Sequence, residues 1–412
     1  MSRSIATYLK RFKVAPPIVK ASPRANLGLV VVIPCYDEPN LSGTLGALTQ
    51  CERPHHSVEV IIVVNDGESD SAQCRQRNEA THAFVKAWAE KHNSSGFALH
   101  AIRLTGVANR KAGVGFARKV GMDEAVQRLA STKVGERGVI ACFDADSECD
   151  PNYLKALEGF LESESSDAAS IYFEHPLDGN NTEAIIAYEL HLRYFVEACR
   201  WAGHPYAFHT VGSSMAVRAN AYARQGGMNT RKAGEDFYFM QKLIPQGRFG
   251  EINGTRIIPS ARCSSRVPFG TGRAMLNYSG CLSTYPMASF GELRTFFKGV
   301  TELWQRDRFA GHELGLLSEF LSLNQFESVL GELRENTNSE MTFVRRFYRW
   351  FNTFVVMKFL HFARSQGRED TPVNEAIVQL GKKSGFGSLE GSMREWLWVL
   401  RARQRRGWEA PQ

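Results

Sequence analysis

The stretch Gly138-Val139-Ile140-Ala141-Cys142-Phe143-Asp144-Ala145-Asp146 decides the fold of this chain. Its apolar part contains β-branched residues, which predicts a buried strand. Because side chains at i and i+2 share one face of an extended segment, Asp144 and Asp146 are expected to point together beyond the strand. Two anions this close favour a cation between them, and oxygen ligands suit a divalent ion, Mg²⁺ or Mn²⁺. Alternatively, the same pair caps a helix that begins near Pro151.

Strands and helices alternate along the first part of the chain. Apolar strands are predicted at Leu27–Pro34 and Val58–Val64, with a weaker strand at Ala98–Leu104. A helix-like segment follows each of them. Strict alternation predicts an α/β fold with a Rossmann-like, mainly parallel sheet and helices on both faces. In such sheets ligands bind beyond the carboxyl ends of the strands.

Polar residues gather at these predicted strand ends. They are Tyr36, Asp37 and Glu38 after the first strand, Asn65-Asp66-Gly67 after the second, and Asp144 and Asp146 after the fourth. Arg110 and Lys111 precede a helix that opens near Gly113, and the free N–H groups of a helix start favour anions. Carboxylates on one side and cations with a helix end on the other fit a nucleoside diphosphate.

Five short segments together resemble a known family. They are Val31-Val32-Ile33-Pro34-Cys35-Tyr36-Asp37-Glu38, Val64-Asn65-Asp66-Gly67, Asn109-Arg110-Lys111-Ala112-Gly113, Asp144-Ala145-Asp146 and Gly234-Glu235-Asp236. In this order and spacing they are similar to the family 2 glycosyltransferases of the GT-A fold, over Leu27–Phe269. The resemblance implies the GT-A form of the α/β sheet.

The resemblance also implies roles for the donor-side residues. Those that would bind the nucleotide-sugar donor are Pro34, Tyr36, Glu38, Asp66, Arg110, Lys111, Gly113 and Asp144. Among them Asp66 would bind the base, and Asp144 would approach the ribose. Asp146, with Asp144, would hold the divalent metal on the diphosphate.

Glu235 and Asp236 supply the acceptor side of the same resemblance. Asp236 would be the general base that takes the proton of an acceptor hydroxyl, and Glu235 would support it or bind the acceptor. Without the resemblance, both acids simply suit the first turn of a helix, where the dipole favours negative charge. The acceptor would be a sugar, a lipid-linked molecule or another small molecule.

Two features depart from the family pattern. No Gln-x-x-Arg-Trp signature follows Asp236, and the histidines beyond it, His312 and His361, lie far along the chain. The run Pro259–Arg273 contains Arg262, Arg266 and Arg273, which suit closure over phosphates or an anionic acceptor. An ordinary basic surface loop explains the same composition.

Charge and composition divide the 412 residues into three parts. We expect a basic N-terminal lead at 1–26, a GT-A catalytic domain at 27–273 and a helical, basic region at 274–412. The first 26 residues hold six Lys or Arg and no acid, and residues 341–412 hold 13 basic against six acidic side chains. The slightly acidic body between them argues against a nucleic acid ligand.

The C-terminal region offers a candidate membrane contact. A helix over Met341–Arg364 would place Phe343, Phe347, Trp350, Phe351 and Phe354 on one face. This face either lies on a membrane surface or packs within its own domain. The tail repeats the chemistry, with tryptophans at 396 and 398 followed by four arginines.

Eight cysteines without a Cys-x-x-Cys motif, and no apolar run of spanning length, lead us to expect a cytoplasmic protein, peripheral on the inner face of the membrane if the tail binds lipid. The resemblance implies a metal-dependent, inverting glycosyltransferase that uses a nucleotide-diphosphate sugar, with UDP favoured. Two other functions fit the same residues. They are a noncatalytic nucleotide-sugar-binding or scaffold protein and a sugar nucleotidyltransferase.

Overall fold

A computed structural model describes residues 2–305, 314–385 and 391–408 of the chain. Its residues form two compact units. Among the described residues, the first comprises 2–179, 210–273 and 404–407, and the second comprises 180–209, 274–305, 314–385, 391–403 and 408. The division at residues 26 and 273 that the sequence suggested stays a prediction; in the structure residues 180–209 group with the C-terminal helices.

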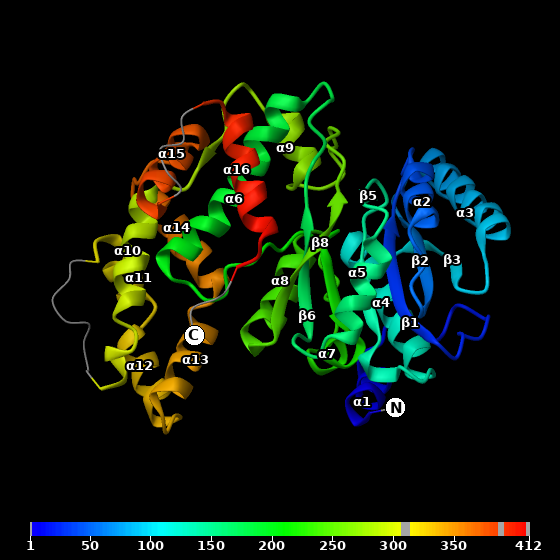
Figure 1. Cartoon of the computed structure of the whole chain (residues 1–412), viewed down its shortest axis with the longest axis horizontal. Coiled ribbons are helices and arrows are strands. Elements are labelled where there is room, and N and C mark those ends of the chain that lie inside the picture. Colours follow the sequence, from blue (N-terminus) through cyan, green and yellow to red (C-terminus); the bar gives the residue numbers. More distant parts are fainter. Residues whose placement is uncertain (1, 306–313, 386–390, 409–412) are drawn as a thin grey trace. The chain divides into compact units, whose positions relative to one another are not determined.

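The first unit is built on an eight-stranded sheet with the order β3-β2-β1-β4-β7-β6-β8-β5. The strands are β1 (Leu27–Cys35), β2 (Ser57–Gly67), β3 (Phe97–Val107), β4 (Val139–Cys142), β5 (Glu148–Cys149), β6 (Ala168–Phe173), β7 (Met215–Arg218) and β8 (Phe249–Ile258). Figure 1 shows helices flanking this sheet. The predicted α/β class, with a largely parallel sheet between helices and a helical C-terminal region, is confirmed.

The central strands run in parallel and end at one edge. β1 pairs in parallel with β2 and with β4, so that Val32 lies opposite both Ile61 and Cys142. The chain then reverses, because β7 is antiparallel to both β4 and β6. The carboxyl ends of β1, β2 and β4 therefore meet at one edge of the sheet. β7 covers only Met215–Arg218, and residues 210–214 lead into it outside the strand.

Helices of the first unit cover this sheet. They are α1 (Arg3–Arg11), α2 (Leu41–Gln50), α3 (Ala72–His92), α4 (Val114–Ala130), α5 (Tyr153–Glu162), α7 (Ala219–Arg224) and α8 (Glu235–Leu243), with short 3-10 turns η1 (Gly135–Arg137) and η2 (Ile244–Gln246). α4 packs closely on the sheet centre because Gly121 has no side chain. A Cβ there would lie 2.4 Å from a Val32 methyl carbon. This close approach fixes where the start of α4 meets the strand ends.

The basic N-terminal segment packs on α4. Tyr8 and Tyr222 both donate hydrogen bonds to the buried Asp123 carboxylate, at 2.5 and 2.8 Å. The backbone N–H of Val14 donates to the same carboxylate at 3.0 Å, and that of Ile18 donates to Glu124 at 2.9 Å. Buried acids of α4 thus hold this segment in place through hydrogen bonds.

The second unit is helical. It contains α6 (Thr182–Ala202), α10 (Met287–Lys298), η3 (Glu302–Trp304), α11 (Leu316–Leu323), α12 (Phe326–Glu335), α13 (Glu340–Trp350), α14 (Thr353–Ser365), α15 (Val373–Ser384) and most of α16 (Met393–Arg405), with a small ladder of β9 (Ser283–Thr284) and β10 (Thr371–Pro372). α9 (Thr271–Asn277) begins in the first unit and ends in the second.

The single helix predicted over 341–364 is wrong, because the chain breaks between α13 and α14. The Asn352 side chain caps α14, accepting hydrogen bonds from the N–H groups of Phe354 and Val355. Phe343, Phe347 and Phe351 are fully buried within the second unit. Most of the aromatic face therefore packs inside its own unit.

Part of the arginine-rich tail also packs within the second unit. Arg401 of α16 is buried and pairs with Glu189 at 2.7 Å, and Arg403 pairs with Glu197 at 3.0 Å. Trp398 stays half exposed. No helix in the described part of the chain combines the length and apolar character needed to cross a bilayer.

Candidate functional site

Asp144 and Asp146 follow β4 at the carboxyl edge of the sheet. The loop between them is held by Thr44 of α2, whose hydroxyl donates a hydrogen bond to the Ala145 carbonyl at 2.9 Å. The two side chains keep 38% and 28% of their surface exposed. Both carboxylates are therefore fixed in position and still accessible to a ligand.

Arg118 joins Asp144 to the start of α8. Its side chain is 2% exposed, and its guanidinium pairs with Asp144 at 2.7 Å and with Glu235. Burial would lower the pKa of Arg118, but Glu235 and Asp144 outweigh burial and raise it. A buried guanidinium is stable in this place because two carboxylates compensate it. Residues 118, 144 and 235, far apart in the sequence, thus meet at one point.

Asp236 lies beside the same guanidinium. Gly234 adopts a left-handed conformation (φ +71°), which lets the chain turn directly into α8. Gly212 faces this turn, and a Cβ at Gly212 would lie 2.8 Å from Asp236 Oδ2 and 2.9 Å from an Arg118 nitrogen. Only a residue without a side chain fits here. Asp236 itself is partly exposed, and its Oδ1 accepts a hydrogen bond from the N–H of Phe237 at 2.7 Å.

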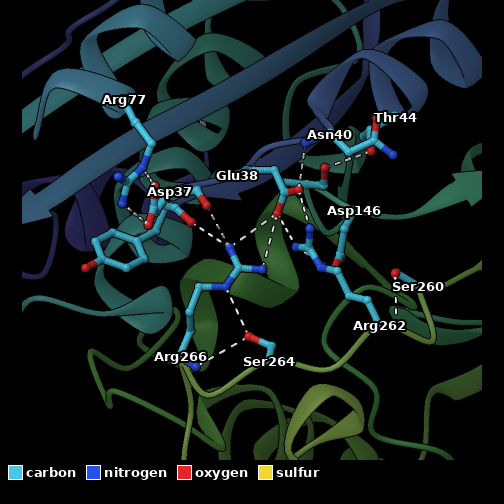
Figure 2. A network of polar contacts seen from close by, with 12 residues as sticks. Asp37, Glu38, Asn40, Thr44, Arg77, Asp146, Ser260, Arg262, Ser264 and Arg266 are labelled. Carbon is cyan, nitrogen blue, oxygen red and sulfur yellow. Dashed lines mark hydrogen bonds and ion pairs between the residues drawn. The ribbon is translucent and has the colours of Figure 1, made fainter. Parts of the chain in front are cut away.

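Glu38 forms ion pairs with two further arginines, Arg262 and Arg266. Its buried carboxylate receives a two-pronged ion pair from Arg262, with one contact at 2.6 Å, and two contacts from Arg266 at 3.3 Å. Arg262 also pairs with Asp146 at 2.9 Å. Figure 2 shows the Arg262 guanidinium between Glu38 and Asp146, and the Arg266 guanidinium reaching Glu38; both arginines lie on the loop that follows β8.

The loop between β1 and α2 is held in an uncommon conformation. Asp37 has φ +48°, unusual for a residue with a side chain. Its N–H donates to Asn78 Oδ1 at 2.8 Å, and its carboxylate pairs with Arg77, which lowers the pKa of Asp37. Tyr36 donates a hydrogen bond to Asp70 at 3.1 Å. These contacts from α3 and its N-terminal side position Tyr36 and Glu38 at the end of β1.

Asp66 stands apart from these acids. It is fully buried at the end of β2, where it pairs with Arg103 and accepts a hydrogen bond from the Gly106 N–H at 2.9 Å. An open hollow of about 520 Å³ lies beside it. The hollow is lined by Asp66, Arg75, Gln76, Glu79, Arg103, Thr105 and Gly106. Asp66 thus lines a neighbouring recess on the β2–β3 side of the sheet edge.

The remaining predicted donor residues lie near the same edge without joining the acid cluster. Pro34 is buried within β1, one position before its end. Arg110 and Lys111 are exposed, and the Lys111 ammonium lies over the Phe116 ring at 5.9 Å. Gly113 caps α4, and a Cβ there would touch the backbone of Lys232 at 3.0 Å. Their roles stay a prediction.

Crowding of negative charge shifts the pKa values of the clustered acids. Burial, together with Asp144, raises the pKa of Asp146 to about 6. Burial, together with Asp236, raises the pKa of Glu235 to about 7. Burial also raises the pKa of Asp236. Perturbed carboxylates gathered at a strand edge are typical of functional sites.

The residues of this cluster fit a divalent cation. Five carboxylates (Glu38, Asp144, Asp146, Glu235 and Asp236) share three guanidiniums (Arg118, Arg262 and Arg266), which leaves two negative charges uncompensated when all five acids are ionised. One Mg²⁺ or Mn²⁺ would balance that excess, and the ligands available are oxygens. Asp144 and Asp146, which are two positions apart and both partly exposed, would be the acids to hold it.

A group elsewhere in the described part of the chain has the spacing of metal ligands. His56, Glu158 and Glu162 bring their ligand atoms within 4.8 Å of one another. His56 precedes β2, so this group lies at the opposite end of that strand from Asp66. The Glu158 carboxylate already accepts hydrogen bonds from the N–H groups of His55 and His56, at 3.1 and 2.8 Å. We therefore attribute a structural role to this group.

Sequence reasoning missed Arg118, the residue that unites the cluster. The available signal was its place one turn after the start of α4 (Val114–Ala130), the helix that begins at the ligand-binding edge. Of the three arginines predicted to line the loop at 259–273, the structure brings Arg262 and Arg266 to the acids. Gly212, in the loop before β7, was not predicted as part of the site either.

Comparisons with known proteins give structural neighbours only. No protein family model matches the chain, and no curated protein matches it. Among solved structures it is similar to S. aureus TarS, with 17% identity and a TM-score of 0.35 over 55% of this chain and 35% of TarS. This chain therefore spans about a third of that TarS chain.

Two further structures contain ligands. The crystal structure of S. aureus TarS 1–349 with UDP-GlcNAc shares 16% identity, with a TM-score of 0.41 over 87% of this chain and 92% of TarS 1–349. That of GalNAc-T7 with UDP, GalNAc and Mn²⁺ shares 13% identity, with a TM-score of 0.36 over 73% of this chain and 54% of GalNAc-T7.

Proposed function

We propose that this chain is a glycosyltransferase that moves a sugar from a nucleotide-diphosphate donor, a UDP-sugar in the first instance, to an acceptor hydroxyl. The observation that carries the proposal is the convergence of Asp144, Glu235 and Asp236 on Arg118, with Asp146 two positions away. Acids at the end of β4 and at the start of α8 thereby share one site. Donor binding at a strand edge and proton removal at a helix start are the two tasks that the reaction needs.

Asp236 is the proposed base. Its raised pKa makes it a better proton acceptor than an ordinary aspartate, and it is partly exposed toward an incoming hydroxyl. Glu235 is buried and tied to Arg118, so its proposed role is to hold that guanidinium beside Asp236. Attack from the side opposite the leaving group would invert the anomeric centre.

Asp144 and Asp146 would hold the divalent cation. When bound, such an ion neutralises the charge that develops on the departing diphosphate. The loop after β1, with Tyr36 and Glu38, and the recess beside Asp66 would hold the nucleotide. A lipid-linked acceptor, with the exposed Trp398 at the membrane, and a cytoplasmic location are parts of the same proposal.

The experiment is a turnover assay with a panel of UDP-, GDP-, ADP- and dTDP-sugars, with and without Mn²⁺. Release of a nucleoside diphosphate is the expected product. Asp146→Ala should abolish the Mn²⁺-stimulated turnover, whereas Asp236→Ala should bind donor and fail to transfer. Formation of pyrophosphate would instead identify a nucleotidyltransferase, and donor binding without turnover would identify a noncatalytic binding protein.

A further inference from the structure

Two arginines of the loop at 259–273 cover a buried acid. Glu38 has a side chain that is only 2% exposed, whereas the side chains of Arg262 and Arg266 are 27% and 31% exposed. The carboxylate therefore forms the floor, and the guanidiniums face outward above it. The accessible surface over Glu38 is therefore formed by the two guanidiniums, next to the partly exposed Asp146.

The two guanidiniums are fixed in place. Arg262 spans both oxygens of Glu38 and reaches Asp146 at 2.9 Å. Arg266 donates to the Tyr36 carbonyl at 2.7 Å and to Ser264 Oγ at 3.2 Å, in addition to its contacts with Glu38. Figure 2 shows these contacts. Guanidiniums held in this way need little reordering when they bind an anion.

Charge indicates which ligand suits them. Glu38 and Asp146 balance Arg262 and Arg266, so these four residues together are neutral. A divalent cation on Asp144 and Asp146 would cancel the excess negative charge of the whole cluster, so that no net negative charge would oppose an anion at the two guanidiniums. A diphosphate carries the opposite charge and the oxygen atoms that a guanidinium fork binds.

We infer that Arg262 and Arg266 form the site for the diphosphate of the donor. This inference rests on the proposed function and adds to it the groups that hold the leaving diphosphate. The Arg262 guanidinium keeps both hydrogen bonds to Glu38. The terminal nitrogen that also contacts Asp146 binds a phosphate oxygen in place of Asp146. Arg266 holds the opposite side of the same diphosphate, next to the Tyr36 carbonyl.

The test measures binding of UDP, inorganic pyrophosphate and uridine by calorimetry, with and without Mn²⁺. The variants are Arg262→Gln, Arg266→Gln and the matched control Arg273→Gln, on α9 of the same segment. Each of the first two should weaken UDP and pyrophosphate about ten- to a hundredfold, because a hydrogen bond to a charged group is lost. Uridine should bind as it does to the wild type, and Arg273→Gln should change none of the three.

Three results would count against this site. UDP affinity equal to that of the wild type in both variants, with a lowered melting temperature, would make the arginines a structural anchor for Glu38. Equal weakening of UDP and uridine would place them at the base. Failure of the wild type to bind any nucleotide would overturn the proposed function, and the diphosphate site with it. If Arg262→Gln does not fold, Arg262→Lys keeps the charge and should still weaken UDP about tenfold through loss of the fork.

Discussion

Two acidic places at the same sheet edge differ in how their charge is balanced. Asp66 is fully buried, and its carboxylate is satisfied by Arg103 and the Gly106 N–H. The cluster at the ends of β1 and β4 and at the start of α8 has five carboxylates for three guanidiniums. An acid with its own partner stabilises the fold, whereas acids in excess leave charge for a ligand to balance. The following changes test that difference.

The largest effect is expected from Asp236→Asn. Loss of a positioned base lowers transfer about 10²- to 10⁴-fold. The amide has almost the same shape, so UDP affinity should stay unchanged. The rates are measured with saturating donor, and UDP affinity is measured by calorimetry. Normal transfer would remove Asp236 from the role of base.

Arg118→Met removes the cation that the cluster shares. Breaking a buried ion pair of this kind lowers the free energy of unfolding by about 3–5 kcal/mol. The uncompensated acids gain higher pKa values in the folded state than in the unfolded state. Stability is therefore retained at low pH and lost as pH rises through those values, more steeply than in the wild type.

The control for Arg118 lies on the same helix. Arg128 of α4 is equally buried and pairs with a single acid, Glu59. Arg128→Met should lower stability by a comparable amount, while the folded variant should keep the transfer rate of the wild type. Denaturant unfolding at several pH values measures both variants. If Arg118→Met and Arg128→Met lower stability and transfer to the same extent, Arg118 acts in transfer only through its contribution to stability.

Gly212→Ala tests the contact between the acid cluster and the loop that precedes β7. A methyl group 2.8 Å from Asp236 Oδ2 must push that carboxylate or Arg118 aside. Displacement of a reacting group by about 1 Å costs about a hundredfold in rate. Gly179→Ala, with open space around its Cβ position, is the matched control. Unchanged transfer in Gly212→Ala would show that Asp236 does not need its present position.

The smallest effect is expected from Asp66→Asn. The change leaves Arg103 with weaker partners, so unfolding should become easier by about 1–3 kcal/mol. If Asp66 also contacts the base, UDP and uridine should both bind about tenfold more weakly, whereas pyrophosphate should not change. Calorimetry with the three ligands decides this. Full UDP and uridine affinity in the folded variant would assign Asp66 to the fold alone.

Local patterns predicted the sheet well. The strands at 27–35, 57–67 and 97–107 each extend the predicted apolar runs by a few residues, and α8 begins at Glu235 as its acidic first turn indicated. Burial on both faces makes such strands continuously apolar, so their identity is local information. The break at Asn352 was missed because an aromatic stripe continues across it, although Asn is a common helix cap.

The site was predictable only in part. Acids at strand ends follow from the topology rule, which predicted that Asp144 and Asp146 lie at the sheet edge, whereas Glu235 and Asp236 became candidates only through the family resemblance. Arg118 escaped because its partners lie 26 and 117 positions away. Ion pairs between residues that are far apart in the sequence produce no periodic pattern from which they could be predicted. The choice of Arg262 and Arg266 over Arg273 likewise depends on the path of one loop.

The most direct measurement is a calorimetric titration of the wild-type chain with UDP in the presence and absence of Mn²⁺, repeated with Asp146→Asn. An excess of two negative charges at the acid cluster predicts binding of one UDP per chain that Mn²⁺ strengthens, and loss of that strengthening in the variant. Two results would contradict a cation site at these acids. One is UDP binding that is unaffected by Mn²⁺ and by Asp146→Asn, and the other is Mn²⁺ binding to the variant that is as tight as binding to the wild type.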